Sequence, residues 1–99
     1  MDAAGIALSG IQAGFVRLGA SAHNVANLAT ADFHPLRTRQ VSLEGGGARA
    51  FAERAPEPEP VALESEWLEQ IRAYHQAAAS MRVLRVDAQL RGVLLDQLA

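Results

Sequence analysis

Apolar side chains recur at alternating steps of four and three along the first thirty residues, and this pattern restricts the possible folds more than any other feature. Such spacing places one apolar stripe on one face of a helix. Four glycines within the segment each cost about 1 kcal/mol of helix propensity relative to alanine. We therefore predict a helix over residues 3–29 that needs a packing partner. Its stripe consists of Ala4, Leu8, Ile11, Phe15, Leu18, Ala22, Val25 and Ala29.

A second helix is predicted over residues 62–98, after the segment APEPEP, whose prolines exclude helix and favour an extended chain. Glutamates fall in its first turns and arginines in its later part, as the helix dipole favours. Its apolar positions form a band wider than a two-stranded seam requires, so we expect more than one neighbour. They are Trp67, Leu68, Ile71, Tyr74, Ala78, Met81, Leu84, Ala88, Leu94, Leu95 and Leu98.

Residues 30–60 are predicted to form an irregular connector with a possible short strand or one β-hairpin. Residues 36–43 alternate in a strand-like way, and Gly45 to Gly47 are expected to end any regular element. At 99 residues the chain has room for one small domain. We predict a mainly α fold over residues 1–99, in which the two long amphipathic helices pair as an antiparallel coiled-coil hairpin and give a rod-like shape.

Composition excludes several classes of function. Nine arginines, no lysine and eleven acidic residues give a formal charge of -2, so no basic surplus attracts nucleic acid. The absence of cysteine excludes disulfides and thiolate metal sites. An acidic residue stands near the N-terminus, and the uncharged run 3–16 is too short to span a bilayer, so we expect neither a cleaved signal nor membrane insertion.

No arrangement of catalytic or metal-binding residues is found. The three histidines lack the i, i+4 spacing of a helical metal site, and Gly45 to Gly47 are not followed by the lysine of a phosphate-binding loop. The serines lack a nucleophile elbow. Glu64, Glu66 and Glu69 fit a solvated helix start better than a catalytic pair. We expect no enzymatic activity, no cofactor and no metal.

Asn24 and Asn27 lie three residues apart near the end of the first predicted helix, where asparagine is an unfavourable choice by propensity. One interpretation is a fraying C-terminus. The other is that both amides bond across an interface and set its register, as a polar residue in a coiled-coil seam does. The sequence leaves both open.

Three segments together resemble the axial proteins of the bacterial flagellum, most closely the short proximal-rod members. ALSGIQAGFVRLGASAHNVANLATADF resembles their N-terminal signature through Leu8, Ser9, Gly10, Arg17, Leu18, Asn24, Ala26 and Asn27. HPLRTRQVSL is similar to the strand that follows it, through Pro35, Leu36, Arg37, Gln40 and Val41. The last part of the chain resembles their C-terminal helix through Val61, Glu66, Ala79, Val83, Leu84, Leu94 and Leu95.

The resemblance implies a structural subunit of the flagellar basal-body rod, exported by the flagellar type III apparatus without signal cleavage and placed in the rod that crosses the periplasm. Its implied partners are other copies of itself, other rod proteins and the export apparatus. The candidate subunit-interface residues are Leu8, Ile11, Phe15, Leu18, Asn24, Asn27, Trp67, Ile71, Tyr74, Met81, Leu84 and Leu95.

Two function classes fit the same apolar stripes. In a structural subunit, assembly of many copies completes the core. In a small helical binding module or export adaptor, the stripes hold one partner helix in a discrete homo-oligomer. An enzyme has no support from the residues.

Overall fold

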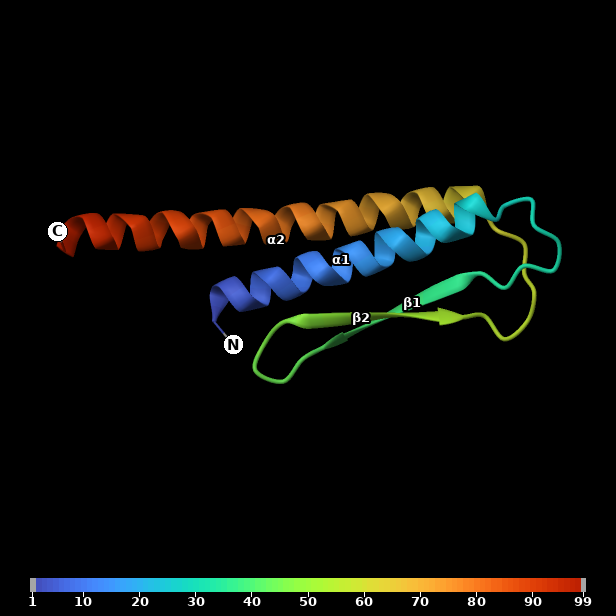
Figure 1. The fold of residues 1–99 in the computed structure, drawn as a ribbon, viewed down its shortest axis with the longest axis horizontal. Coiled ribbons are helices and arrows are strands. Elements are labelled where there is room, and N and C mark those ends of the chain that lie inside the picture. Colours follow the sequence, from blue (N-terminus) through green and yellow to red (C-terminus); the bar gives the residue numbers. More distant parts are fainter. Residues whose placement is uncertain (1, 99) are drawn as a thin grey trace.

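The computed structural model describes residues 2–98 and has the element order α1 (Ala3–Ala26), β1 (Leu36–Ser42), β2 (Ala48–Arg54) and α2 (Leu63–Leu98). The chain is mainly helical, with two helices and a small antiparallel hairpin between them, as the sequence predicts. Its extents are 63 × 24 × 14 Å, and α2 runs along most of the longest dimension (Figure 1).

Helix α1 is closed at both ends by polar side chains. The Gly5 N–H donates to Asp2 Oδ1 at 2.8 Å, and this bond lowers the pKa of the Asp2 carboxyl. At the other end Asn27 is the C-cap, and its backbone N–H donates to the carbonyl oxygen of His23 at 3.2 Å. The helix ends at Ala26, three residues before the predicted boundary at 29, because the chain turns at this cap.

The middle segment is a regular hairpin. Strands β1 and β2 pair antiparallel, with Leu36 opposite Arg54 and Ser42 opposite Ala48. Gly45, Gly46 and Gly47 have φ angles of 85°, 101° and 95°, a region that residues with a Cβ rarely adopt. The triple glycine, which was expected only to end regular structure, therefore makes the reversal between the two strands.

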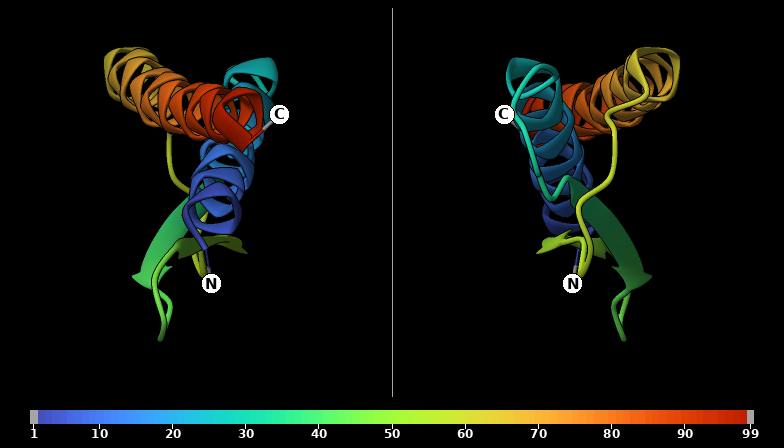
Figure 2. Two further views of the ribbon diagram at one scale, coloured as in Figure 1. Left: turned by 90° about the vertical axis from the view of Figure 1, so that its left-hand side faces the viewer. Right: turned by 90° about the vertical axis from the view of Figure 1, so that its right-hand side faces the viewer.

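The elements form three layers, with α1 in the middle. Helix α2 lies on one side of α1 and the hairpin on another, and the end-on views show both neighbours of α1 (Figure 2). Contacts of Gly10 with Ser80 and of Ser21 with Glu66 show that α1 and α2 run in opposite directions. The central position of α1 means that two of its faces are covered within one chain.

The buried hydrophobic residues are small. Six of the seven are alanines, and Ile11 is the only large one among residues 2–98. Small side chains let helix axes approach closely but bury little apolar area each. Most large apolar side chains of α2 remain exposed. The core therefore holds the layers together through close approach and polar contacts more than through bulky packing.

Candidate functional site

The seam between the helices is built on glycine. A Cβ at Gly14 would lie 3.1 Å from both the carbonyl oxygen of Ala73 and the Cβ of Ala77, and a Cβ at Gly10 would collide with the Ser80 side chain. The spacing of four residues between Gly10 and Gly14 thus permits close approach of the two helices. The closest approaches and hydrogen bonds of α1 to α2 involve Gly10, Gly14, Arg17, Ser21 and Asn24.

These contact positions follow steps of four and three, and each lies one residue before a member of the predicted apolar stripe. Gly14 precedes Phe15, and Arg17 precedes Leu18. Because successive helical residues point about 100° apart, the predicted stripe turns away from the centre of the seam. The side chain of Phe15 is 55% exposed as a result. The stripe therefore does not lie at the centre of the seam, although its members Leu18 and Val25 border residues of α2 at one edge.

Arg17 makes the strongest polar contact of the seam. Its Nε and Nη2 donate to the two carboxylate oxygens of Glu69 at 2.9 and 2.8 Å, and its Nη1 donates to Gln76 at 2.6 Å. The Thr38 hydroxyl donates to the same carboxylate at 3.2 Å, so one acidic group joins α1, α2 and β1. The hydrogen bond from Arg17 lowers the pKa of Glu69, and Glu69 raises the pKa of Arg17.

Asn24 is 2% exposed and bonds entirely within the chain. Its Oδ1 accepts the Leu36 N–H at 2.7 Å, and its Nδ2 donates to the Leu36 carbonyl at 2.9 Å and to both Glu66 carboxylate oxygens at 3.1 Å. The amide thus satisfies a backbone donor and acceptor at the start of β1. The predicted place of Asn24 at a subunit interface is corrected, since no part of the amide is available to a second chain.

Asn27 has a local role. Its Nδ2 donates to the His23 carbonyl at 2.9 Å, and its Oδ1 accepts the Thr30 hydroxyl at 3.1 Å. These bonds complete the helix end and the following turn. Within the chain the two asparagines therefore have different roles, Asn24 in the core and Asn27 at the helix end.

The other predicted interface residues divide by exposure. Ile11 is 8% exposed and belongs to the core, which corrects its assignment to an interface. Leu18 and Leu84 are half-buried. The remaining seven project large apolar surface into solvent, and they are Leu8, Phe15, Trp67, Ile71, Tyr74, Met81 and Leu95.

Two adjoining apolar depressions lie on α2 along its border with α1, and together we call them the Trp67 groove. Leu18 borders a depression made by Trp67, Gln70, Ile71 and Tyr74, while Val25 borders the adjoining one at Leu63. Trp67 lies in both depressions and is 68% exposed. The sequence prediction did not include Leu63 or Gln70 among the interface residues, although their spacing of seven places them on the same face as Trp67.

Residues 2–98 contain no group of three or more side chains suited to hold a metal ion. Helix α1 is long and apolar enough to cross a membrane, a criterion that buried helices and signal sequences also meet. The apolar helix is longer than the uncharged run 3–16, because it continues through Arg17 to Ala26.

Comparison with models of known protein families and with curated proteins finds no match. The functional interpretation therefore rests on the exposed apolar surfaces of α1 and α2. The fold leaves these surfaces without a neighbour inside the chain.

Proposed function

We propose that this chain is a structural subunit that assembles with other copies through its two terminal helices. The observation that carries the proposal is the exposure of large apolar side chains on both helices, Phe15 on α1 and Trp67 and Tyr74 on α2 among them. Monomeric proteins rarely expose contiguous apolar surface of this kind without a use for it. Packing against neighbouring copies would cover it.

The helix pair is proposed to be an antiparallel coiled coil that acts as the building unit. Support comes from the steps of four and three between the α1 residues that contact α2, from Gly10 to Asn24. Two polar contacts, Arg17 with Glu69 and Asn24 with Glu66, fix the register of the pair. A unit with its register set inside the chain can present its apolar faces to neighbours without rearrangement.

The assembly we propose is the rod of the bacterial flagellar basal body. The N-terminal and C-terminal segments resemble rod proteins in the right order, and the unit they form is elongated, with extents of 63 × 24 × 14 Å. In this proposal the partners are other copies and other rod proteins, the chain is delivered by the flagellar type III apparatus, and the rod crosses the periplasm. The role is architectural, with no catalysis, no cofactor and no insertion into the membrane.

The test is the association state of the purified full chain. We expect the mass measured by sedimentation to rise continuously with concentration, and elongated particles to be visible by electron microscopy. Phe15→Asp should prevent this growth, because it buries an unpaired charge in the contact. Gln12→Asp, an exposed site on the same helix, is the matched control. A discrete dimer that grows no further would contradict the proposal and favour the small binding module.

A cellular test addresses the flagellar part of the proposal. Deleting the gene in its native bacterium should abolish swimming and leave basal bodies without a complete rod. The wild-type chain should restore swimming, and Phe15→Asp should not. Normal motility in the deletion strain would contradict the assignment to the rod even if the purified chain assembles.

A further inference from the structure

We propose that copies of this chain join head to tail, with the C-terminal part of α2 from one copy seated in the Trp67 groove of the next. The inference rests on the proposed function and names the partner surface for it. In Figure 1 the C-terminal end of α2 and the start of α2 lie at opposite ends of the molecule. Two different surfaces at opposite ends make a heterologous contact, and such contacts generate open assemblies when the rotation does not close.

The donor surface is a stripe on the second half of α2. Val83, Val86, Leu90 and Val93 follow steps of three and four and are each 50–59% exposed. The residues of this region that face α1 lie elsewhere on the helix, since it is Ser80 that meets Gly10 and Arg91 that reaches Asp2. Helix α2 also continues past the start of α1, so its last turns have no helical neighbour inside the chain (Figure 1).

The acceptor surface has the form that such a stripe requires. In knobs-into-holes packing, each apolar side chain enters a hole made by four residues of the facing helix at positions i, i+3, i+4 and i+7. Trp67, Gln70, Ile71 and Tyr74 occupy these positions and form a depression in the structure. Leu63, Trp67 and Gln70 form the next one along. Two successive holes match two successive knobs of the donor stripe.

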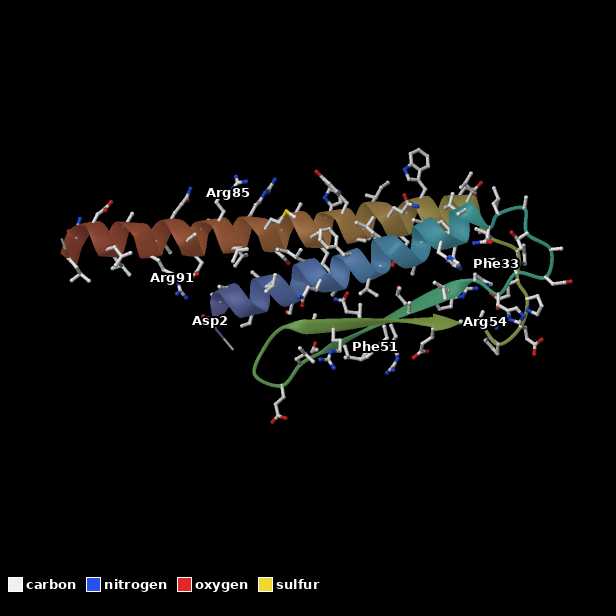
Figure 3. All side chains as sticks on the ribbon, viewed as in Figure 1. Asp2, Phe33, Phe51, Arg54, Arg85 and Arg91 are labelled. Atoms are coloured by element: carbon white, nitrogen blue, oxygen red, sulfur yellow. The ribbon has the colours of Figure 1, made fainter. Side chains whose placement is uncertain are left out.

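The charges at the two ends are complementary. From Glu57 to Gln70 the chain carries five glutamates and no basic residue, while Arg82, Arg85 and Arg91 outnumber the two acidic residues of the segment 82–98. Among residues 2–98, Glu57, Glu64, Arg82 and Arg85 form no ion pair. Arg85 points away from α1, whereas Arg91 points toward Asp2 (Figure 3). The basic C-terminal part of one copy is therefore attracted to the acidic end of another copy, and two ends of like charge would repel each other.

The experiment mixes two full-length variants that each lack one half of the contact. Leu90→Asp removes the donor stripe, and Trp67→Glu removes the acceptor groove. Both side chains are more than half exposed, so the fold should tolerate the changes, and circular dichroism should report unchanged helicity. Gln89→Asp and Ser65→Asp place the same charge on exposed positions beside each surface and serve as controls.

We expect each variant alone to remain monomeric at concentrations where the wild type and both controls assemble. An equimolar mixture should form a species of twice the monomer mass that grows no further, because it contains one intact donor facing one intact acceptor. A mixture that stays monomeric while the wild type assembles would overturn the head-to-tail contact and leave the proposed function standing. A wild-type chain that stays monomeric at every concentration would overturn both.

Discussion

Both helices carry apolar residues at helical spacing, yet the fold uses the two helices in different ways. Helix α1 has eight buried residues and contacts both α2 and the hairpin, whereas the longer α2 has only two, Ala73 and Ala77. The difference shows that the other elements pack around α1, because its small residues permit close approach of α2 on one side and of the hairpin on another. Helix α2 is covered along one face and presents the others, including Trp67, Tyr74 and Leu90, to solvent.

The largest expected effect comes from breaking the face of α1 that meets α2. Gly14→Leu should lower the free energy of unfolding by about 3 kcal/mol, because the added side chain meets backbone atoms of Ala73 that cannot move aside. Gly19→Ala is the control, since a Cβ there meets nothing within 4 Å. It should stabilise the chain by about 1 kcal/mol. Urea unfolding of both variants measures the contrast, and equal destabilisation would show that the seam is not tightly packed.

The next effect tests the face of α1 that meets the hairpin. Asn24→Ala should destabilise the chain by about 2 kcal/mol, because it leaves the Leu36 N–H and C=O without their partners. Hydrogen exchange of the Leu36 amide should become faster. Asn27→Ala should leave that amide protected, since its bonds are confined to the helix end. Unchanged protection in the Asn24 variant would mean that β1 is held by other contacts.

A smaller effect depends on pH. Arg17→Ala should lower the free energy of unfolding by about 1.5 kcal/mol at pH 7, since it removes charge-assisted hydrogen bonds to Glu69. The folded-state pKa of Glu69 lies below its ordinary value of 4.5, so its contribution is present above that value and is lost as the pH falls through the folded pKa. The difference between wild type and variant should therefore shrink at pH 3. A difference that stays constant between pH 7 and pH 3 would assign it to packing.

The smallest effect on stability is expected on α2. Trp67→Ala should change the free energy of unfolding by no more than about 0.5 kcal/mol, because the side chain is 68% exposed. The same change should remove concentration-dependent association in sedimentation. A loss of stability as large as that of Gly14→Leu would show that α2 is as important to the core as α1, and the contrast between the helices would fail.

Much of the fold follows from local patterns in the sequence. The prolines of APEPEP separate the connector from α2, and apolar residues at helical spacing indicate both helices. The first strand of the hairpin is signalled by the alternation of residues 36–43, whereas the second strand and the three positive φ angles of Gly45 to Gly47 are visible only in the structure. Seven of the residues predicted for an interface are exposed in the structure, and their assignment to an interface stays a prediction.

The seam and the role of Asn24 were not predictable from the same signals. On α1 two stripes one residue apart share the heptad period, and hydrophobicity alone favours the one that contains Leu18 over the one that contains Arg17. The sequence by itself determined the two helices and their apolar period, because these depend on neighbouring residues. Only the tertiary structure decided that Gly14 and Arg17 lie at the centre of the seam with α2 while Phe15 faces solvent. That arrangement depends on Glu66, Glu69 and Ala73 of α2, which lie more than forty residues from their α1 partners in the chain. These three residues contact small or polar residues of α1 at close range.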